Sequence, residues 1–592
     1  AVMRAAMPPL FWSDNMTEEW TRETQEFKRF EMEGFTENDM IELIRLPVKV
    51  LGKHVARAQE RARKAFDKEE EPAPPPLAPK DKTLTLAVKL HRTQRKKKAL
   101  QIIQSHGVAR DNAQNRKQIR GLHPLPRERE RRGEVQEAIP GPQYSDEQIE
   151  RVARELEAQM GPPDGGGWGG PGEILPIQQA RDTLKEKLGD VTKAVGPLGW
   201  ALWFLKPIVG ASPTLLESIA MTMQRIAAGQ VSANMTALLT VGRLIALLKE
   251  PSKGEASTEA EEEEEAREEE REQEVERETE TDKIRPVNLG AALLKVSLQA
   301  LMEMEDIKEA VAEMSDLQYA LQERGVQRVI QYFQAAFDQG KPIYSRDLQN
   351  AFNALLRELL APGTPARLKW AAIRYYGGPS LIYHKGALIV GHRGPRQGCP
   401  LGTALFCMAT HAMYRSFGKE FTTMVPRAVA DDLNTTTVVA PDTEEGWKEY
   451  YREIGQAANW LEREAEKLGM CDNSRKRYLL LPAHAPDPPE GRDALPESIK
   501  VKRDGIVIGG APVGTREFCK EYIRGKAEEV LKLQKIAAEP IFAAQNPDIA
   551  LDFIRSSVVK LHFSLSNSPP SVTDEIAEEV DSKVWESLES LL

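Results

Sequence analysis

The chain has little cysteine and no long apolar run. Its 592 residues include only four cysteines, none of them in C-x-x-C spacing: Cys399, Cys407, Cys471 and Cys519. Neither a disulfide framework nor a zinc knuckle is therefore indicated. The most apolar run, residues 198–205, is far shorter than the roughly 20 residues that cross a bilayer. No signal pattern is visible at the amino terminus, so we expect an intracellular protein of several domains with no membrane partner.

The chain also lacks the overall positive charge expected of a protein that binds nucleic acid. Its net charge of −10 is concentrated in residues 255–282, where 16 acidic and 3 basic residues give −13 and leave about +3 for the rest. A block this dense in one sign is typical of a solvated, disordered loop. The acidic insert as a whole spans residues 252–282. A second interpretation is that it mimics nucleic acid and occupies a basic cleft.

Residues 80–132 carry the opposite charge. They include 16 basic and 4 acidic residues, a net of +12. Such a segment binds phosphates without sequence preference because binding releases counterions, although a solvated helix face has a similar composition. The run RTQRKKK at 92–98 is also typical of a nuclear localisation signal. We therefore expect a segment that binds nucleic acid, and a nuclear location.

Two adjacent carboxylates are the most informative local feature. The stretch VADDLNTTTVV places Asp431 and Asp432 at a turn between β-branched runs. Paired acids repel and raise each other's pKa unless a cation compensates them, and hard cations such as Mg²⁺ take carboxylate oxygens as ligands. Taken alone, the pair is also common at hairpin turns, because aspartate tolerates turn geometry.

A third acid precedes this pair in the sequence KPIYSRDLQNAFN, where Asp347 follows a short apolar run and would lie at the end of a strand. A palm-type polymerase places one acid on such a strand and two on a neighbouring hairpin, so that two cations hold the attacking and leaving oxygens of phosphoryl transfer. We therefore predict that Asp347, Asp431 and Asp432 are catalytic residues and the ligands of two Mg²⁺ ions, with Mn²⁺ as an alternative metal.

The order of the motifs resembles that of reverse transcriptases from non-LTR (LINE-type) retrotransposons, over roughly residues 215–592. The matching segments resemble two strands of the fingers, a first catalytic motif, a template and nucleotide loop, a metal-binding box, a lysine-bearing motif and a primer-grip hairpin. In chain order they are LTVGRLIALLKEP (239–251) with DKIRPVNLGAALLKV (282–296), DLQNAFN (347–353), RGPRQGCPLG (393–402), VADD (429–432), KLGMCDNSRKRYLLL (467–481) and GIVIGGAPVG (505–514).

The resemblance implies roles for cationic residues. Arg285 and Lys295 lie on the segment that meets the incoming triphosphate in that family, and Lys476 matches the lysine near the leaving pyrophosphate, where it would donate a proton as a catalytic residue. Without the motifs, an arginine beside a proline and a lysine in a basic cluster are ordinary solvated residues.

The resemblance also implies nucleotide-binding residues. Phe352, five residues after Asp347, would be the steric gate that excludes a 2′-hydroxyl, and Gln397 and Gly398 would contact the base pair, with Arg396 adding a phosphate contact. The alternatives are a core phenylalanine and a solvated glutamine.

These observations lead to a fold prediction: an α+β right-hand polymerase with fingers, a palm built on an antiparallel sheet, a helical thumb and a largely helical amino-terminal extension. The predicted domains run from a helical region of unknown role through a basic segment with Pro- and Gly-rich linkers to the three polymerase parts: 1–70, 71–172, 173–346 (helices and fingers), 347–516 (palm) and 517–592 (thumb).

The predicted function is RNA-directed DNA synthesis, in which a DNA primer on an RNA template is extended with deoxynucleoside triphosphates and the template-primer is held through its A-form shape and phosphates. The alternative is a catalytically decayed or domesticated relative that binds RNA; Val429, where the family usually has an aromatic residue, and the acidic insert favour it, whereas three retained acids argue against it. A viral RNA-dependent RNA polymerase shares the palm, but usually has glycine in place of Ala430.

Overall fold

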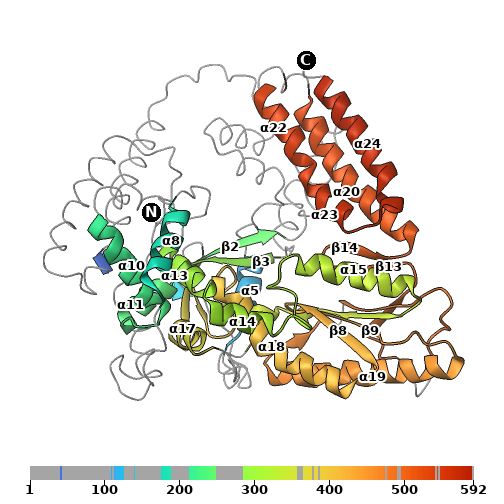
Figure 1. Cartoon of the computed structure of the whole chain (residues 1–592), viewed down its shortest axis with the longest axis horizontal. Helices are drawn as coiled ribbons and strands as arrows, with labels where there is room; N and C mark the ends of the chain where they lie inside the picture. The colour runs from blue at the N-terminus through green and yellow to red at the C-terminus, as the bar shows by residue number, and fades with distance from the viewer. Residues whose placement is uncertain are drawn as a thin grey trace, which may run out of the picture. The chain divides into compact units, whose positions relative to one another are not determined.

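The computed structural model describes residues 41–42, 109, 113–125, 139–140, 175–188, 213–248, 284–355, 365–376, 379–384, 387–473, 476–489, 495–539, 543 and 547–589. They form a mixed helix and sheet structure (Figure 1). Their contacts divide them into two compact units. The first unit holds the described parts of His106–Ala310 and Phe352–Leu405, and the second holds those of Val311–Ala351 and Phe406–Leu592.

A five-stranded sheet with the order β1-β7-β6-β2-β3 is the framework of the first unit. Its strands are β1 (Ile139–Pro140), β2 (Gly242–Leu248), β3 (Ile284–Leu289), β6 (Ser380–His384) and β7 (Ala387–Gly391). Strands β2 and β6 are parallel and the other pairs are antiparallel. The two strands expected within 239–251 and 282–296 are therefore present, as the β2–β3 pair.

The first unit also contains several helices. Those wholly within the first unit are α5 (Ala113–Gly121), α8 (Ile177–Lys187), α10 (Pro213–Ala227), α11 (Ala233–Thr240), α13 (Ala292–Met302) and α17 (Ala366–Tyr376). Three further helices contain residues of both units: α14 (Glu305–Ala312), α16 (Ala351–Ala354) and α18 (Pro400–Glu420). Helix α5 contacts β3 and α11 contacts β6, and helices α8, α10 and α13 pack against one another.

Three predicted boundaries differ from this division. Residues 311–346, expected with the helices and fingers, belong to the second unit. Ile119 of α5, expected in the basic segment 71–172, is buried with Leu244 of β2 and Ile284 of β3, so α5 belongs to the first unit. Residues 352–405, expected in the palm, also belong to the first unit, because β6 and β7 hydrogen-bond into its sheet. The acidic insert, nearly all of residues 1–70 and most of the basic segment lie outside the described residues.

The second unit is built on a sheet with the order β12-β11-β4-β9-β8, in which β11 and β12 are parallel and the other pairs antiparallel. Its strands are β4 (Ile343–Arg346), β8 (Met424–Val429), β9 (Asp432–Thr437), β11 (Arg477–Leu480) and β12 (Ile499–Lys502). β-Branched residues are frequent in β9, as expected for a strand buried on both faces. The central strand is β4, which positions the candidate site.

Helix α15 (Gly325–Asp338) and the hairpin of β13 (Gly505–Ile508) and β14 (Ala511–Gly514) pack on this sheet. Phe333 of α15 and Ile506 of β13 share a buried cluster with Ile343 of β4. The hairpin expected at 505–514 is therefore present. Helix α19 (Glu444–Lys467) begins at its N-cap Thr443, whose side chain accepts a hydrogen bond from the Gly446 amide, as helix starts commonly require.

The last part of the second unit is helical, as expected for residues 517–592. Its helices are α20 (Arg516–Ala537), α22 (Pro547–Ser557), α23 (Val559–Ser566) and α24 (Pro570–Glu589). They lie side by side in Figure 1, and the other three pack against α20. Ile523 of α20, Leu561 of α23 and Ile576 of α24 are nearly inaccessible to solvent and form one core. In the part of the chain that the structure describes, no helix is both long and apolar enough to cross a membrane.

Candidate active site

Strand pairing brings Asp347 next to Asp432. Strands β4 and β9 are antiparallel, and Arg346 is opposite Leu433 at the end of β4. Asp347 follows Arg346 directly, just beyond the last paired residues, and its side chain is hydrogen-bonded with that of Asp432. Two acids that are 85 positions apart in the sequence are therefore neighbours on one face of the second unit's sheet.

A two-stranded ladder holds Asp347 from its other side. After Asp347 the chain forms β5 (Leu348–Gln349), which pairs with β10 (Cys471–Asp472) so that Asp472 is opposite Leu348. The next residue, Asn473, donates its backbone N–H to the Asp347 carbonyl oxygen at 3.0 Å and its side-chain Nδ2 to Asp347 Oδ2 at 2.9 Å. The carboxylate is therefore fixed by the segment that also carries Lys476.

Lys476 supplies the cationic partner of Asp347. Its Nζ lies 2.9 Å from Asp347 Oδ2, with the lysine side chain 61% exposed and the aspartate side chain 16% exposed. Partial burial lowers the pKa of Lys476, but its hydrogen bond to Asp347 and the charges of Asp347, Asp432 and Asp431 outweigh this effect and raise the pKa above its ordinary value. The ammonium group is therefore protonated at neutral pH and points at the acids.

The other two acids lie on a β-hairpin. Strands β8 and β9 pair from Met424 opposite Thr437 to Val429 opposite Asp432, which leaves a loop of two residues, Ala430 and Asp431. This is the tight turn between β-branched runs that the sequence predicts. Ala430 has a φ of +54°, which is uncommon for a residue with a Cβ atom.

The acids influence one another electrostatically. Burial, together with the charges of Asp431 and Asp347 and a hydrogen bond with Asp347, raises the pKa of Asp432 to about 7, while Lys476 opposes the rise. Burial is the largest cause of this rise, and the neighbouring acids add to it beyond what Lys476 offsets. The site therefore favours a further positive charge.

Whether these acids suit a metal ion can be judged from their chemistry. Among the described residues, no group of three or more His, Cys, Asp and Glu side chains is set in a ready metal-binding arrangement. The positive charge against Asp347 is instead the Lys476 ammonium. Carboxylate oxygens are nonetheless the donors that Mg²⁺ prefers, and the elevated pKa of Asp432 is the property that a divalent cation would relieve.

A buried ion network lies directly behind the acids. Arg346, next to Asp347 in the chain, donates a hydrogen bond to Asp472 Oδ1, and Arg477, next to Lys476, forms an ion pair with Asp472 Oδ2 at 2.5 Å. The side chains of Arg346 and Asp472 are 2% exposed. Sequence reasoning did not single out these residues or Asn473. The available signal was the alternation of charge in DNSRKR.

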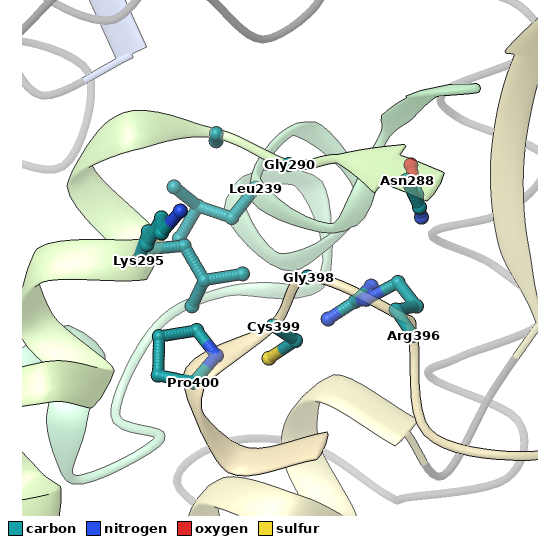
Figure 2. Close-up of a pocket in the computed structure, with 10 residues that line it drawn as sticks. Leu239, Asn288, Gly290, Lys295, Arg396, Gly398, Cys399 and Pro400 are labelled. Atoms are coloured by element: carbon teal, nitrogen blue, oxygen red, sulfur yellow. The ribbon is translucent and has the colours of Figure 1, made fainter. Parts of the chain in front are cut away.

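Three of the residues expected to bind the nucleotide line a small pocket in the first unit. Figure 2 shows Lys295, from the first turn of α13, on one side of this pocket and Arg396 on the other, with Gly398 between them. The enclosed space is about 20 Å³, enough for about one water molecule. The buried Asn288 side chain also lines the pocket, and neither its Oδ1 nor its Nδ2 has a hydrogen-bond partner among the described residues.

The Arg396 side chain is buried and partly engaged by the protein itself. The residue is 7% exposed, and its Nη1 donates to the Thr240 carbonyl oxygen at 3.0 Å and to Ser380 Oγ at 3.3 Å. Its guanidinium carbon lies 4.7 Å from the centre of the Tyr376 ring. Nη1 therefore holds the loop to α11 and β6, whereas Nη2 has no hydrogen-bond partner among the described residues.

The remaining expected residues also lie in the first unit. Arg285 is exposed on β3, and Phe352 is half-buried in the short helix α16. The half-buried Gln397 accepts a hydrogen bond at its carbonyl oxygen from the Asn288 N–H at 3.1 Å. The structure therefore brings Asp347, Asp431, Asp432 and Lys476 together in the second unit, whereas the six nucleotide-binding candidates belong to the first.

Comparison of the chain with protein-family models gives no match, and comparison with curated proteins gives none.

Proposed function

We propose that the chain is an RNA-directed DNA polymerase of the non-LTR retrotransposon type. The observation that carries the proposal is the β4–β9 register, which sets Asp347 beside Asp432 at the tip of a hairpin that also carries Asp431. Three acids on a strand end and an adjacent turn are the donor set that phosphoryl transfer with two cations needs. The type of reaction, DNA synthesis on an RNA template, is proposed from the order of the sequence motifs.

The proposed reaction is the attack of a primer 3′-hydroxyl on the α-phosphate of a deoxynucleoside triphosphate. Asp347, Asp431 and Asp432 would hold two Mg²⁺ ions, which would supply Lewis-acid stabilisation of the reacting oxygens. Such catalysis is largely positioning and electrostatic stabilisation. Lys476 is proposed to donate a proton from Nζ to the leaving pyrophosphate, because its ammonium group lies 2.9 Å from Asp347 Oδ2 at the cluster of acids.

The substrates in this proposal are an RNA template, a DNA primer and deoxynucleoside triphosphates. Arg285 and Phe352 are proposed to contact the triphosphate and the sugar, and Gln397 and Gly398 the base pair. Lys295 is proposed to act with Arg285, since it lies at the start of α13 and lines the pocket of the first unit.

The test is primer extension by the purified chain on an RNA template, with template binding measured in parallel by fluorescence anisotropy. We expect Mg²⁺-dependent extension that Asp431→Asn abolishes while RNA binding persists. Asp442→Asn is the matched control, because Asp442 is an exposed acid shortly after β9 and its loss should leave extension unchanged. A wild-type chain that binds RNA but extends no primer with Mg²⁺ or Mn²⁺ would instead be the decayed RNA-binding relative.

A further inference from the structure

The turn that carries Asp431 has a strained backbone. Ala430 adopts a φ of +54°, and a Cβ atom makes this left-handed region unfavourable for residues other than glycine. Such conformations persist only where the surrounding structure holds them. In the second unit, the residue that holds Ala430 comes from a segment more than 100 positions earlier.

That residue is Gln318, which engages both polar groups of Ala430. Gln318 Oε1 accepts a hydrogen bond from the Ala430 N–H at 2.8 Å, and Gln318 Nε2 donates one to the Ala430 carbonyl oxygen at 3.2 Å. The Tyr414 hydroxyl donates to the same carbonyl oxygen at 3.3 Å. A side-chain amide that bridges N–H and C=O of one residue restricts rotation of the backbone on both sides of its Cα atom.

Gln318 is itself fixed in position. Its neighbours pair with β8, since the Tyr319 N–H donates to the Ala428 carbonyl oxygen at 2.8 Å and the Ala428 N–H donates to the Leu317 carbonyl oxygen at 2.7 Å. Gln318 is 2% exposed, and its Oε1 also accepts from the Ala320 N–H at 3.2 Å. Both ends of the bridge are therefore anchored to the same edge of the sheet.

We propose that Gln318 is a positioning residue, which sets the orientation of Asp431 and Asp432 by holding the Ala430 backbone in its left-handed conformation. The inference rests on the proposed function for its catalytic consequence, but the bridge itself is a property of the fold. Gln318 touches no reacting atom; it acts through the turn. Misplacement of catalytic ligands by about 1 Å costs on the order of 100-fold in rate.

The test is Gln318→Met, which keeps the length of the side chain and removes both hydrogen-bonding groups. We expect the rate constant for single-nucleotide extension to fall 10- to 100-fold, in line with that sensitivity to misplacement, and the Mg²⁺ concentration for half-maximal rate to rise, with little change in KM for the template-primer. If this variant does not fold, Gln318→Asn replaces it, because its amide is withdrawn by one carbon–carbon bond and cannot span both groups of Ala430.

Gln334 provides a matched control. Its Nε2 donates to the Gly514 carbonyl oxygen and its Oε1 accepts from the Gly514 N–H, both at 3.0 Å. The bridge has the same form, lies in the same unit and does not contact the turn of Asp431. We expect both Gln334→Met and Gln318→Met to lower the thermal midpoint, whereas Gln334→Met should leave the Mg²⁺ requirement at its wild-type value.

Glycine at position 430 provides a rescue. Glycine adopts a positive φ without steric cost, so Ala430→Gly should restore much of the rate and the Mg²⁺ requirement in the Gln318→Met background. It should also raise the thermal midpoint more in that background than in the wild type. A residue that mattered only for packing would show neither effect.

The outcomes separate this inference from the proposed function. If the wild type extends primers and Gln318→Met has a wild-type rate and Mg²⁺ requirement, the role of Gln318 is overturned and the function stands. If the wild type extends no primer, the proposed function is wrong. The role of Gln318 is then tested by Mn²⁺ binding, measured by electron paramagnetic resonance, and by the thermal midpoints of Gln318→Met, Ala430→Gly and the double variant. If Ala430→Gly changes the thermal midpoint equally in the wild type and in Gln318→Met, and Gln318→Met binds Mn²⁺ as the wild type does, the proposed role of Gln318 is wrong.

Discussion

Arg346 and Asp472 form an ion pair in which each side chain is only 2% exposed. The same carboxylate is also paired with Arg477. Removing one partner of a buried pair leaves the remaining charge uncompensated and typically costs about 3–5 kcal/mol. Because Asp472 compensates two arginines, its neutralisation should affect the stability of the second unit strongly.

We therefore expect Asp472→Asn to lower the free energy of unfolding by about 3–5 kcal/mol, measured by chemical denaturation. Asp487→Asn is the control, since Asp487 pairs with Arg503 but is 90% exposed, and such surface pairs contribute about 0–1 kcal/mol. Similar losses in the two variants would show that the buried network contributes no more than a surface ion pair.

The raised pKa of Asp432 predicts a pH-dependent stability. In the folded chain this pKa is about 7, against an ordinary value of 3.8. Between these values the folded state keeps a proton that the unfolded state releases, so stability falls as pH rises. In the wild type, the free energy of unfolding should therefore fall by roughly 2–4 kcal/mol between about pH 4 and pH 7. We expect this fall to be absent in Asp432→Asn.

The measurement for Asp432 is the difference in unfolding free energy between variant and wild type at several pH values. Asp442→Asn, which changes an exposed acid, should give a difference that does not vary with pH. A difference for Asp432→Asn that is equally flat would mean that the carboxyl group titrates near its ordinary value in the folded chain.

Lys476 should matter for rate more than for folding, because its side chain is 61% exposed. Loss of a general acid typically costs 10²- to 10⁴-fold in rate, and we expect a decrease of about this size for Lys476→Met in single-turnover extension. The same variant should raise the pKa of Asp432 further, because Lys476 lowers it. Lys467→Met is the control, since Lys467 pairs with Glu464 at the end of α19; a similar loss in both variants would contradict a specific role.

Gly394 should be intolerant of any side chain. Its φ is +66°, and a Cβ atom there would lie 1.8 Å from the Phe352 carbonyl oxygen. The backbone around Gly394 is also fixed by its N–H, which donates to the Leu355 carbonyl oxygen at 2.8 Å. We expect Gly394→Ala to lower the free energy of unfolding of the first unit by more than about 2 kcal/mol, measured by chemical denaturation. Gly121→Ala, where nothing lies within 4 Å of the added atom, should change stability by less than about 1 kcal/mol; equal effects would contradict the steric argument.

Local sequence patterns predicted the elements that carry the candidate site. The apolar run before Asp347 and the β-branched runs around Asp431 correspond to β4 and to the β8–β9 hairpin. These elements could be predicted because strand alternation and turn residues act over a few positions. The two glycines between β13 and β14, both with positive φ, mark a hairpin for the same reason.

Local sequence patterns could not predict contacts between residues that are far apart in the chain. The parallel pairing of β2 with β6 joins Gly242 to Ile382, and no local signal indicates it. The sequence therefore did not indicate that residues 352–405 share a unit with β2. Gln318 lies in an irregular segment and bridges to Ala430 across 112 positions. A polar residue of this kind looks like ordinary solvated surface until the fold buries it.

The position of β4 has a mechanical consequence. This strand has a hydrogen-bonded neighbour on each side, β11 and β9, whereas β8 lies at the end of the strand order. Opening of a sheet usually begins at its margins, and amide hydrogens in the middle exchange last. We therefore expect amide hydrogens of β4, which leads into Asp347, to exchange more slowly than those of β8, which leads into the turn of Asp431.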